Sequence, residues 1–549
     1  MKRKLLVLFL GVFLTCIQAI AQQVTVTGKV NSSDGPIPGV SVKVKGTTAI
    51  SQTNGDGVFS IRASANDVLV FSYIGYAPIE RSVGNNTTIN VTLVEDSEGL
   101  NEVVVVGFGT QKKESLTGSV STVNVAKVFG NRPIPDLGRG LQGAVPGLSV
   151  VVPSGEVGSD PILRIRGQIG SVNGSANPLI LVDNVEIPSI QYVNPNDIEN
   201  ITVLKDAASS AIYGAKAAFG VILITTKNGA NTTGTNVTYS NNFVLQSPFK
   251  PIDIAGIDGL EYTLDAHENM RQPGPAGGFW RIDRTSFERI KEWQTKYGGS
   301  VGNSDPVVYG RDWSWDGVQK FGYRIYDPVE AMIKDNPLSQ IHNLGLNGKS
   351  GNTNYNLSVG YLGQEGMMKP AKHDDYRRVT PALNITTKAT DYLTLRGGVR
   401  YAEGTKRNPN SLNSAAFSAD PWLYMYRWSR LFPIGVQEQG QDIIDPAFSA
   451  RMSNDQIRNE KFLNLNLGAT VKITDAWDVQ ADYAYSTQNN LTTASVPYVQ
   501  GRTHWYGVEA LRDGTGAQVY VDENGNPTNT GGVPAYRFPL TDHTVKADT

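Results

Sequence analysis

Alternation between apolar and polar residues in the second half of the chain sets the tightest limit on its fold. Successive residues of a β-strand point to opposite faces, so strict alternation gives a strand one apolar and one polar face. The segments 393–401, 464–473 and 477–485 all alternate in this way. In the first of them the apolar side carries Leu393, Leu395, Val399 and Tyr401, and the polar side carries Thr394, Arg396 and Arg400. These segments predict strands that separate an apolar environment from a strongly polar one.

The length and polarity of these strands indicate where they lie. A soluble β-sandwich can also alternate. Strands near 10 residues long, aromatic residues at strand ends and a strongly polar second face favour a transmembrane β-barrel with a wet lumen. We expect roughly seven such strands from Asn236 to Gln488, followed by a tail rich in glycine, asparagine and proline.

Residues 1–21 have the pattern of a secretory signal peptide. Lys2, Arg3 and Lys4 precede an apolar run, and Ala19-Ile20-Ala21 is a small-x-small cleavage signal. The run is shorter than the roughly 20 residues of a membrane anchor. Cys16, the only cysteine, lies before the expected cut and lacks the context of a lipoprotein signal. The mature chain is therefore expected to be exported, without lipid and without cysteine.

Residues 22–95 contain short alternating runs such as VTVTGKV, GVSVKVKG and DVLVFSYIGY, separated by turn sequences such as SSDGP and TNGDG. This spacing predicts a small antiparallel β-sandwich. Asn54, Asp56 and Gly57 could hold a cation, but the same residues serve a turn, and we prefer the turn. The order of runs resembles the carboxypeptidase-regulatory-like domain, which implies a sandwich without catalytic groups of its own.

Residues 96–113 form a linker that contains the sequence LNEVVVVGFGTQKK. Its acidic start, Glu95 to Glu98, is typical of an exposed segment. The valine run that follows is too short to build a sheet alone. It is either a strand of one of the neighbouring domains or a strand held out for the sheet edge of another protein, where backbone hydrogen bonds supply the affinity. The run itself does not choose between these interpretations.

Residues 114–230 predict a compact α+β domain. Asp136–Gln142 suits a short helix that Pro146-Gly147 terminates, and Asp206–Phe219 suits an alanine-rich helix. The sequences ILRIR, LILVD and VILITTK suit strands.

The motifs NEVVVVGFGTQKK, LQGAVPGLSV, PILRIRGQIG and ITTKNG, in this order, closely resemble the SusC/RagA branch of TonB-dependent outer-membrane transporters. The resemblance implies a mostly β protein: a β-sandwich, an α+β plug at 114–230, and the first strands of a large transmembrane β-barrel at 231–549. It also implies a TonB box, the strand that binds TonB, formed by Glu102, Val103, Val104, Val105, Val106 and Gly107.

The resemblance further implies import across the bacterial outer membrane, with the sandwich and plug on the periplasmic side. Members of the branch usually work with a SusD-like surface lipoprotein and import oligosaccharides or peptides. No cofactor is implied. A secreted or surface adhesin that binds glycans without transport remains the alternative.

Arg164 and Arg166 alternate with apolar residues in the sequence LRIR. In a strand, both guanidinium groups would leave the same face. If they are buried in a barrel lumen they need carboxylate partners on the barrel wall, and if they are exposed they are ordinary surface charges. The expected position of the plug favours pairing with the wall.

Aromatic residues gather in the segment after the first expected barrel strand. Tyr309, Trp313 and Trp315 are candidates for stacking on a sugar. Such residues more often form an interfacial girdle or the core of a loop. The sequence does not identify the cargo.

Enzymatic and nucleic-acid functions find little support in the sequence. The histidines have no metal-ligand spacing, the glycine-rich stretches match no nucleotide loop, and the charge balance is not that of a nucleic-acid binder. A hydrolase that uses carboxylates such as Asp312 or Asp316 is the least favoured of the functions considered. No metal site is expected.

The length of the chain does not fit a complete transporter. Outer-membrane transporters of this class have barrels of roughly 22 strands. At about 10 residues per strand plus turns, such a barrel does not fit into the residues after Ala230. We therefore expect the chain to be an N-terminal fragment or a truncated product.

Overall fold

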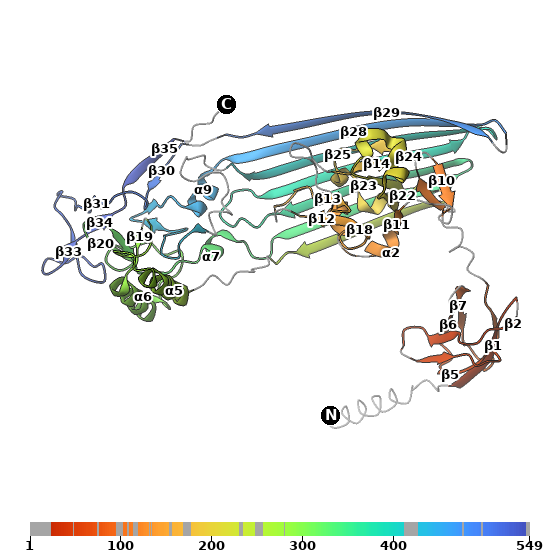
Figure 1. Ribbon diagram of the computed structural model, residues 1–549, viewed down its shortest axis with the longest axis horizontal. Helices are drawn as coiled ribbons and strands as arrows, with labels where there is room; N and C mark the ends of the chain where they lie inside the picture. The colour runs from red at the N-terminus through yellow and green to blue at the C-terminus, as the bar shows by residue number, and fades with distance from the viewer. Residues whose placement is uncertain are drawn as a thin grey trace, which may run out of the picture. The chain divides into compact units, whose positions relative to one another are not determined.

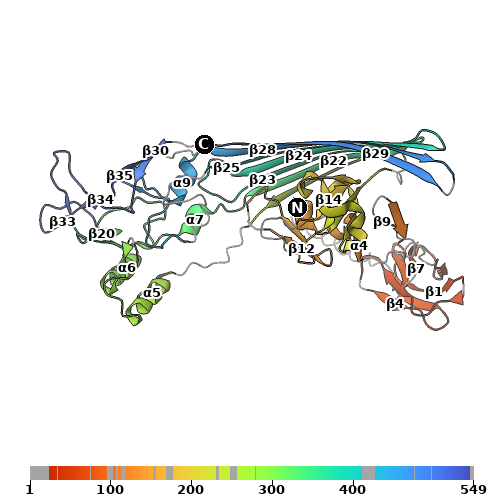
Figure 2. The same ribbon diagram turned by 45° about the horizontal axis from the view of Figure 1, so that its top comes forward.

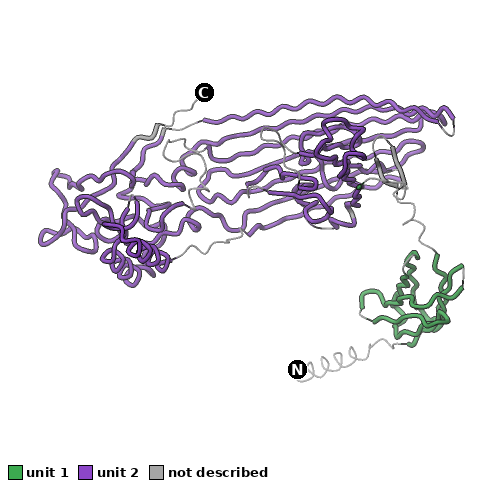
Figure 3. The backbone as a smooth tube through the Cα atoms, in the orientation of Figure 1, with its two compact units in different colours: residues 1–119 green, residues 120–549 purple. Residues whose placement is uncertain are grey.

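The structure is a computed structural model, and it describes residues 24–544 apart from 34, 48, 74–75, 95–102, 107–108, 113–118, 131, 133, 153–155, 168–176, 230–233, 248–255, 279, 411–426, 475–476 and 496–497. The expected signal peptide and the acidic start of the linker lie outside the described residues. The chain divides into two compact units, residues 1–119 and 120–549 (Figure 3).

The first unit contains the expected β-sandwich. One sheet has the order β2-β1-β5, with β8 pairing β1, and the other has the order β4-β3-β6-β7. The strands are β1 (Val24–Ser32), β2 (Gly35–Pro36), β3 (Ser41–Val44), β4 (Ile50–Gln52), β5 (Val58–Ala63), β6 (Val68–Tyr73), β7 (Tyr76–Ser82) and β8 (Val91–Thr92). Alternate residues such as Val26, Val42, Phe59 and Leu69 are buried in the core.

Asn54 and Gly57 serve the turn before β5, as preferred from the sequence. The Asn54 side-chain oxygen accepts the backbone N–H groups of Asp56 at 3.1 Å and Val58 at 2.8 Å. Gly57 has φ +75°, which a residue with a side chain adopts only with strain.

The valine run forms a hairpin. Strand β9 (Val103–Val106) pairs antiparallel with β10 (Gly109–Lys112), with Val104 opposite Gln111. The two strands form a sheet of their own. The run is therefore not a strand of either neighbouring sheet, and its partner is the segment that follows it.

The second unit begins with the α+β domain, which we call the plug (residues 120–229). Its main sheet has the order β11-β16-β17-β14-β15, and β12 and β13 form a separate hairpin. The strands are β11 (Val120–Asn124), β12 (Leu148–Val151), β13 (Ile162–Ile165), β14 (Leu179–Val182), β15 (Val185–Glu186), β16 (Ile198–Leu204) and β17 (Val221–Thr226). The helical segments are α2 (Val125–Phe129), α3 (Leu137–Gly140), η2 (Ile190–Tyr192), η3 (Pro195–Asp197), α4 (Ala207–Ser210) and η4 (Ala211–Ala217).

Side-chain caps explain where the plug helices start. Asp136 accepts the backbone N–H of Arg139 at the start of α3, at 2.7 Å, and Asp206 does the same for Ser209 at the start of α4. The expected continuous helix from Asp206 to Phe219 is wrong. Gly214 has φ 67° and ψ −154°, which is not helical, so the segment breaks into α4 and η4.

A large antiparallel sheet follows, which we call the wall (Figure 1). Its seven strands run in sequence order, which confirms the number expected from the sequence. They are β18 (Thr235–Leu245), β22 (Leu338–Ser350), β23 (Thr353–Glu365), β24 (Asp375–Lys388), β25 (Leu393–Pro409), β28 (Asp455–Lys472) and β29 (Asp478–Thr493). Connections at one end are short, as at 351–352, whereas those at the other end are long, as at 246–337.

One face of the wall is apolar and exposed. The expected alternation is confirmed, because the apolar residues of neighbouring strands lie side by side in the register, as with Val399 opposite Leu465. Leu467 and Tyr483 are also opposite each other and are 64% and 66% exposed. We call this the outward face. The plug lies against the other face, the inner face (Figure 2).

The long connections form a lobe at one end of the wall, which we call the connecting lobe (residues 256–337, 427–454 and 498–544). Its helices are α5 (Ile257–Asn269), α6 (Arg284–Tyr297), α7 (Pro328–Met332) and α9 (Pro446–Met452). Its short strands are β19 (Trp280–Arg281), β20 (Trp313–Trp315), β21 (Lys320–Gly322), β26 (Gln437–Glu438), β27 (Gln441–Asp442), β30 (Tyr498–Arg502), β31 (Glu509–Ala510), β32 (Tyr520–Val521), β33 (Val533–Pro534), β34 (Tyr536–Arg537) and β35 (Leu540–Thr544). In the part of the chain that the structure describes, no helix has the length and apolar character needed to cross a membrane.

Candidate functional site

The contact between the plug and the inner face of the wall is the candidate functional site. Polar wall side chains on this face are buried under the plug rather than exposed to a lumen. They include Asn356, Ser358, Arg378, Thr380 and Arg400. Buried polar groups need hydrogen-bond partners, and many of these partners lie on the plug.

An ion pair joins the plug to the centre of the wall. Asp183 lies in the tight turn between β14 and β15, with φ 48°, a conformation that aspartate tolerates better than most residues. Its carboxylate accepts the backbone N–H of Thr226 at 2.9 Å and the Thr226 hydroxyl at 2.7 Å. Arg400 on β25 donates from Nη2 to Asp183 Oδ2 at 3.2 Å. The arginine side chain is 7% exposed, so this pair is largely removed from water.

A second carboxyl of the plug contacts the wall through a hydroxyl. The Ser358 hydroxyl on β23 donates to Asp197 Oδ2 at 2.6 Å. Burial raises the pKa of the Asp197 carboxyl to about 6, against the opposing effects of the Ser358 hydrogen bond and of the nearby Arg400 and Lys227 charges. Asp197 therefore takes up a proton in mildly acidic solution.

Arg378 on β24 holds the plug through neutral oxygens. Its guanidinium donates to the Pro135 carbonyl at 2.9 Å and to Gln191 Oε1 at 3.3 Å. Burial raises the pKa of the neighbouring Asp136, whose charge is stabilised in part by its bond to the Arg139 N–H. The wall arginines therefore reach two separate parts of the plug.

Apolar contacts complete the interface. Tyr192 stacks on Phe462 of β28 with ring centroids 5.1 Å apart and an interplanar angle of 13°. Phe462 and Ala402 belong to the hydrophobic core of the plug, so that core extends onto the wall. Gly158 approaches the Tyr376 ring so closely that an added Cβ would lie 2.5 Å from it. The plug and the wall are packed as one body.

Arg164 and Arg166 do not share one strand face. Arg164 lies on β13, but Arg166 follows the end of that strand with φ 56°, so the expected alternation ends before it. Neither forms a salt bridge within the described residues, and Arg166 is exposed. Two ion pairs between the plug and the wall, Asp183–Arg400 and Glu156–Lys406, have the opposite polarity, with the carboxylate on the plug and the cation on the wall. Pairing of Arg164 and Arg166 with wall carboxylates stays a prediction.

The aromatic candidates lie in the core of the connecting lobe. Trp313 is fully buried and stacks on Phe538 with ring centroids 4.3 Å apart. Tyr309 is 7% exposed and meets Trp313 edge-on at 4.9 Å, while the partly buried Trp315 packs against the same core. These positions favour the loop-core interpretation over sugar stacking.

The two carboxylates considered for hydrolysis have structural partners. Asp312 is buried, pairs with Arg311 at 2.8 Å and accepts the indole N–H of Trp293 at 2.9 Å. Asp316 accepts the backbone N–H groups of Val318 and Gln319. Within the described ranges, no group of histidine, cysteine, aspartate or glutamate is arranged to hold a metal ion.

Of the proposed TonB box, Val103 to Val106 are in strand β9, whereas Glu102 and Gly107 lie outside the described residues. The hairpin with β10 occupies one edge of this strand.

Sequence reasoning missed the residues that hold the plug, Asp183, Asp197, Ser358 and Arg378. The alternation did place Arg400 on the polar side of its strand, and this was the one sequence signal for a residue that contacts the plug. The Asp-Asn pair at 183–184 marks a turn in the sequence, but a turn signal does not reveal what lies opposite.

Two known protein families match parts of the sequence. The CarboxypepD_reg-like domain matches residues 26–105, and the TonB-dependent Receptor Plug Domain matches residues 112–221.

Curated relatives match over most of the chain. The TonB-dependent receptor SusC of Bacteroides thetaiotaomicron is 32% identical over 440 residues, covering 78% of this chain and 38% of that protein. The TonB-dependent receptor P26 of Formosa agariphila is 29% identical over 494 residues, covering 88% of this chain and 45% of that protein. The chain thus spans less than half the length of these relatives.

Solved structures share the fold. The RagAB peptide importer in the 'open-open' state matches with a TM-score of 0.54 and 22% identity, covering 73% of this chain and 43% of that chain. The same importer in the 'closed-closed' state gives a TM-score of 0.52 with 21% identity, covering 70% of this chain and 42% of that chain.

Proposed function

Because the chain belongs to the SusC/RagA family of TonB-dependent receptors, we propose that it supplies the plug and the first wall strands of an energy-coupled outer-membrane importer. The observation that supports this proposal is the difference between the two faces of the wall. The outward face is apolar and exposed, and the inner face holds the plug through buried polar contacts. A sheet of this kind suits lipid on one side and an obstructed lumen on the other.

Energy would reach the plug through the valine strand. An outer membrane has no ATP, so uphill import requires work from the inner membrane. Residues Glu102 to Gly107 would add as a strand to the periplasmic domain of TonB, and tension on that strand would rearrange the plug. Strand β9 keeps one edge free of β10, and backbone pairing at a strand edge needs no particular side chain.

The cargo and the surface partner are proposed from the relatives. One relative is the TonB-dependent receptor SusC, and one similar solved structure is described as a peptide importer. An oligosaccharide or a peptide is therefore the proposed cargo, and a SusD-like lipoprotein is the proposed surface partner. The long connections at one end of the wall would lie outside the cell, where that partner would bind, and the sandwich and plug would lie on the periplasmic side.

Three deletion strains test the importer assignment. Cells lacking this receptor, cells lacking TonB, and cells lacking both are grown on a panel of oligosaccharides and peptides. We expect loss of the receptor to abolish growth on at least one nutrient, loss of TonB to abolish growth on the same nutrient, and the double deletion to add nothing. A growth defect that TonB deletion does not share would contradict the assignment and support the adhesin alternative.

A further inference from the structure

We propose that solute crosses the plug region along a polar seam between the plug and strands β18, β22, β23 and β24, and that the seam favours anionic over cationic solutes. This inference rests on the proposed importer function. The seam consists of two cavities of about 270 and about 410 Å³, which share lining residues from both sides of the interface. The shared plug residues are Gly130, Arg132, Asn194, Asn196 and Lys227, and the shared wall residues are Asn242 and Asn343.

The second cavity runs along β18 and β22, whereas the first crosses from β18 through β22 and β23 to β24. Along β22, the first cavity reaches Ile341 and the second reaches Asn347. At about 3.3 Å per residue this is about 20 Å of strand, or about 15 Å along the barrel axis at a typical tilt. The hydrocarbon core of a bilayer is about 30 Å thick. The seam therefore already extends over about half of the barrier while the plug is docked.

Three cations line the seam, and the nearby carboxylates Asp197 and Asp136 compensate their charge only in part. Lys227 donates to the Asn196 carbonyl at 2.8 Å, and Arg132 donates to the carbonyls of Phe129 and Val128. Neither cation forms a salt bridge within the described part of the chain. Arg378, on the wall side, likewise bonds to neutral oxygens.

One carboxyl, Asp197, lines the seam against these three cations, and its hydrogen bond goes to Ser358. An anion entering the seam thus meets a net positive field, which water partly screens because Arg132 and Lys227 are exposed.

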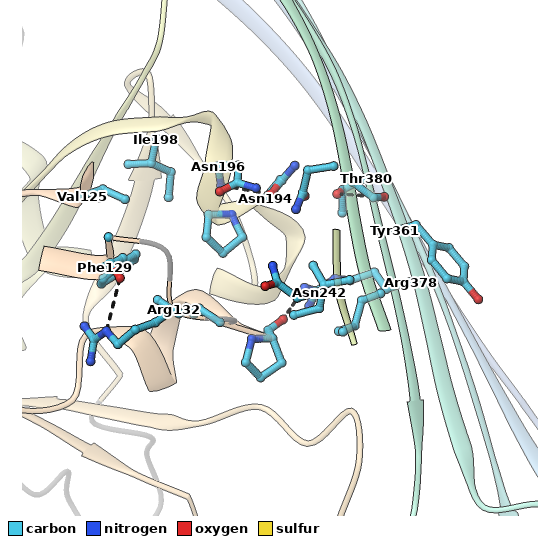
Figure 4. Close-up of a pocket in the computed structure, with 18 of the residues that line it drawn as sticks. Val125, Phe129, Arg132, Asn194, Asn196, Ile198, Asn242, Tyr361, Arg378 and Thr380 are labelled. Carbon is cyan, nitrogen blue, oxygen red and sulfur yellow. Dashed lines mark hydrogen bonds between the residues drawn. The ribbon is translucent and has the colours of Figure 1, made fainter. Parts of the chain in front are cut away.

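The buried side-chain amide of Asn194 also lacks a hydrogen-bond acceptor within the described residues. Asn194 is 6% exposed, its side-chain oxygen accepts the Asn196 N–H at 3.0 Å, and its Nδ2 has no hydrogen-bond partner within the described residues. Figure 4 shows Asn194 and Asn196 of the plug opposite Asn242 and Arg378 on the wall side. A buried amide donor without a partner is costly, and water or the hydroxyl or carboxylate oxygen of a solute would satisfy it.

Thiol labelling tests the charge preference without knowledge of the cargo. The expected mature chain has no cysteine, so Asn343→Cys places a single thiol in the seam of the purified receptor in detergent. We expect the anionic sulfonatoethyl methanethiosulfonate to react about tenfold faster, relative to a free thiol, than the cationic trimethylammonioethyl reagent. Adding Lys227→Glu should remove or reverse this preference.

The matched control is Ser486→Cys, an exposed inner-face position on β29 that lines neither cavity. Equal reaction of the two reagents at Asn343→Cys, or the same preference at both positions, would overturn the charge assignment.

Cross-linking tests the route. Asn196 and Ser240 face each other across the seam, with the amide nitrogen 3.5 Å from the hydroxyl. Cells that carry Asn196→Cys/Ser240→Cys are treated with the short thiol cross-linker dibromobimane. We expect cross-linking to abolish TonB-dependent growth on the nutrient that the deletion strains identify. The control pair is Glu156→Cys/Lys406→Cys, a plug–wall ion pair of 2.8 Å outside both cavities, and its cross-link should leave growth intact.

Each outcome decides between the routes. If both cross-links stop growth, the plug moves as a whole and the seam is not the route. If neither does, or if the control pair alone does, the route lies elsewhere. Absence of TonB-dependent growth in the untreated double-cysteine strains and in the parent would instead contradict the importer function itself.

Discussion

The ion pair between Asp183 and Arg400 predicts that Asp183→Asn lowers the free energy of unfolding more than Arg400→Gln does. In Asp183→Asn the turn survives, because asparagine also tolerates a positive φ. The Arg400 guanidinium, which is 7% exposed, is then left without a carboxylate. Removing one partner of a fully buried pair costs about 3–5 kcal/mol, whereas exposed pairs contribute about 0–1 kcal/mol. Since Asp183 is 25% exposed, we expect about 3 kcal/mol.

The reverse substitution should be milder. In Arg400→Gln the carboxylate keeps both hydrogen bonds from Thr226 and its access to water, so we expect about 1 kcal/mol. The double variant should be about 2 kcal/mol less destabilised than the sum of the two single variants, a coupling that corresponds to about a 30-fold change in an equilibrium constant.

Chemical denaturation of the purified protein in detergent measures the free energies of this cycle. Lys216→Gln is the control, since Lys216 pairs with Glu186 at the plug surface with 70% and 51% exposure, and it should change stability by less than about 0.5 kcal/mol. Additive costs in the double variant, or a larger cost for Arg400→Gln than for Asp183→Asn, would refute the buried pair as a plug anchor.

Three further predictions concern single residues. The pKa of Asp197 rises from 3.8 to about 6 on folding, so the folded protein binds this proton more tightly, and the free energy of unfolding should fall as pH rises from 4 to 6, by at most about 3 kcal/mol. Asp197→Asn should remove this pH dependence from thermal melting, and an unchanged profile would contradict it. Trp313→Ala should cost about 3–5 kcal/mol by opening a cavity in the lobe core, whereas Trp477→Ala, at a site 61% exposed, should cost less than about 1 kcal/mol; equal melting of the two variants would argue against burial. Gly158→Ala should lower the melting temperature, because it forces a Cβ against Tyr376 and a side chain into φ +70°, and normal melting would contradict the close packing of plug and wall.

Periodicity was enough to predict the wall. Its strands alternate over about nine or ten residues in the sequence, and alternation fixes which residues share a face, so the number of strands and the outward positions of Leu467 and Tyr483 followed directly. The starts of the plug helices followed from Asp136 and Asp206 for a similar reason, because a cap acts within a few residues.

Contacts between distant segments were harder to predict. Alternation placed Arg400 on the polar face, but nothing local to Arg400 indicates that a turn residue 217 positions away lies opposite. The polarity of the plug–wall pair was therefore not predictable, and Arg164 and Arg166 were chosen instead. The break at Gly214 was missed because the surrounding alanines favour a helix more strongly than one glycine opposes it.

The valine strand gives the most direct test of TonB coupling, the central claim. If strand addition delivers the energy, backbone pairing matters more than any one side chain, so Val104→Ala should be mild, whereas Val104→Pro removes an N–H group and blocks the ladder. The measurement is the affinity of each full-length variant for the purified periplasmic domain of TonB, with the melting temperature determined on the same sample. We predict that Val104→Pro loses TonB binding with an unchanged melting temperature and that Val104→Ala keeps both. Normal TonB binding by the proline variant, together with a lowered melting temperature, would contradict the account.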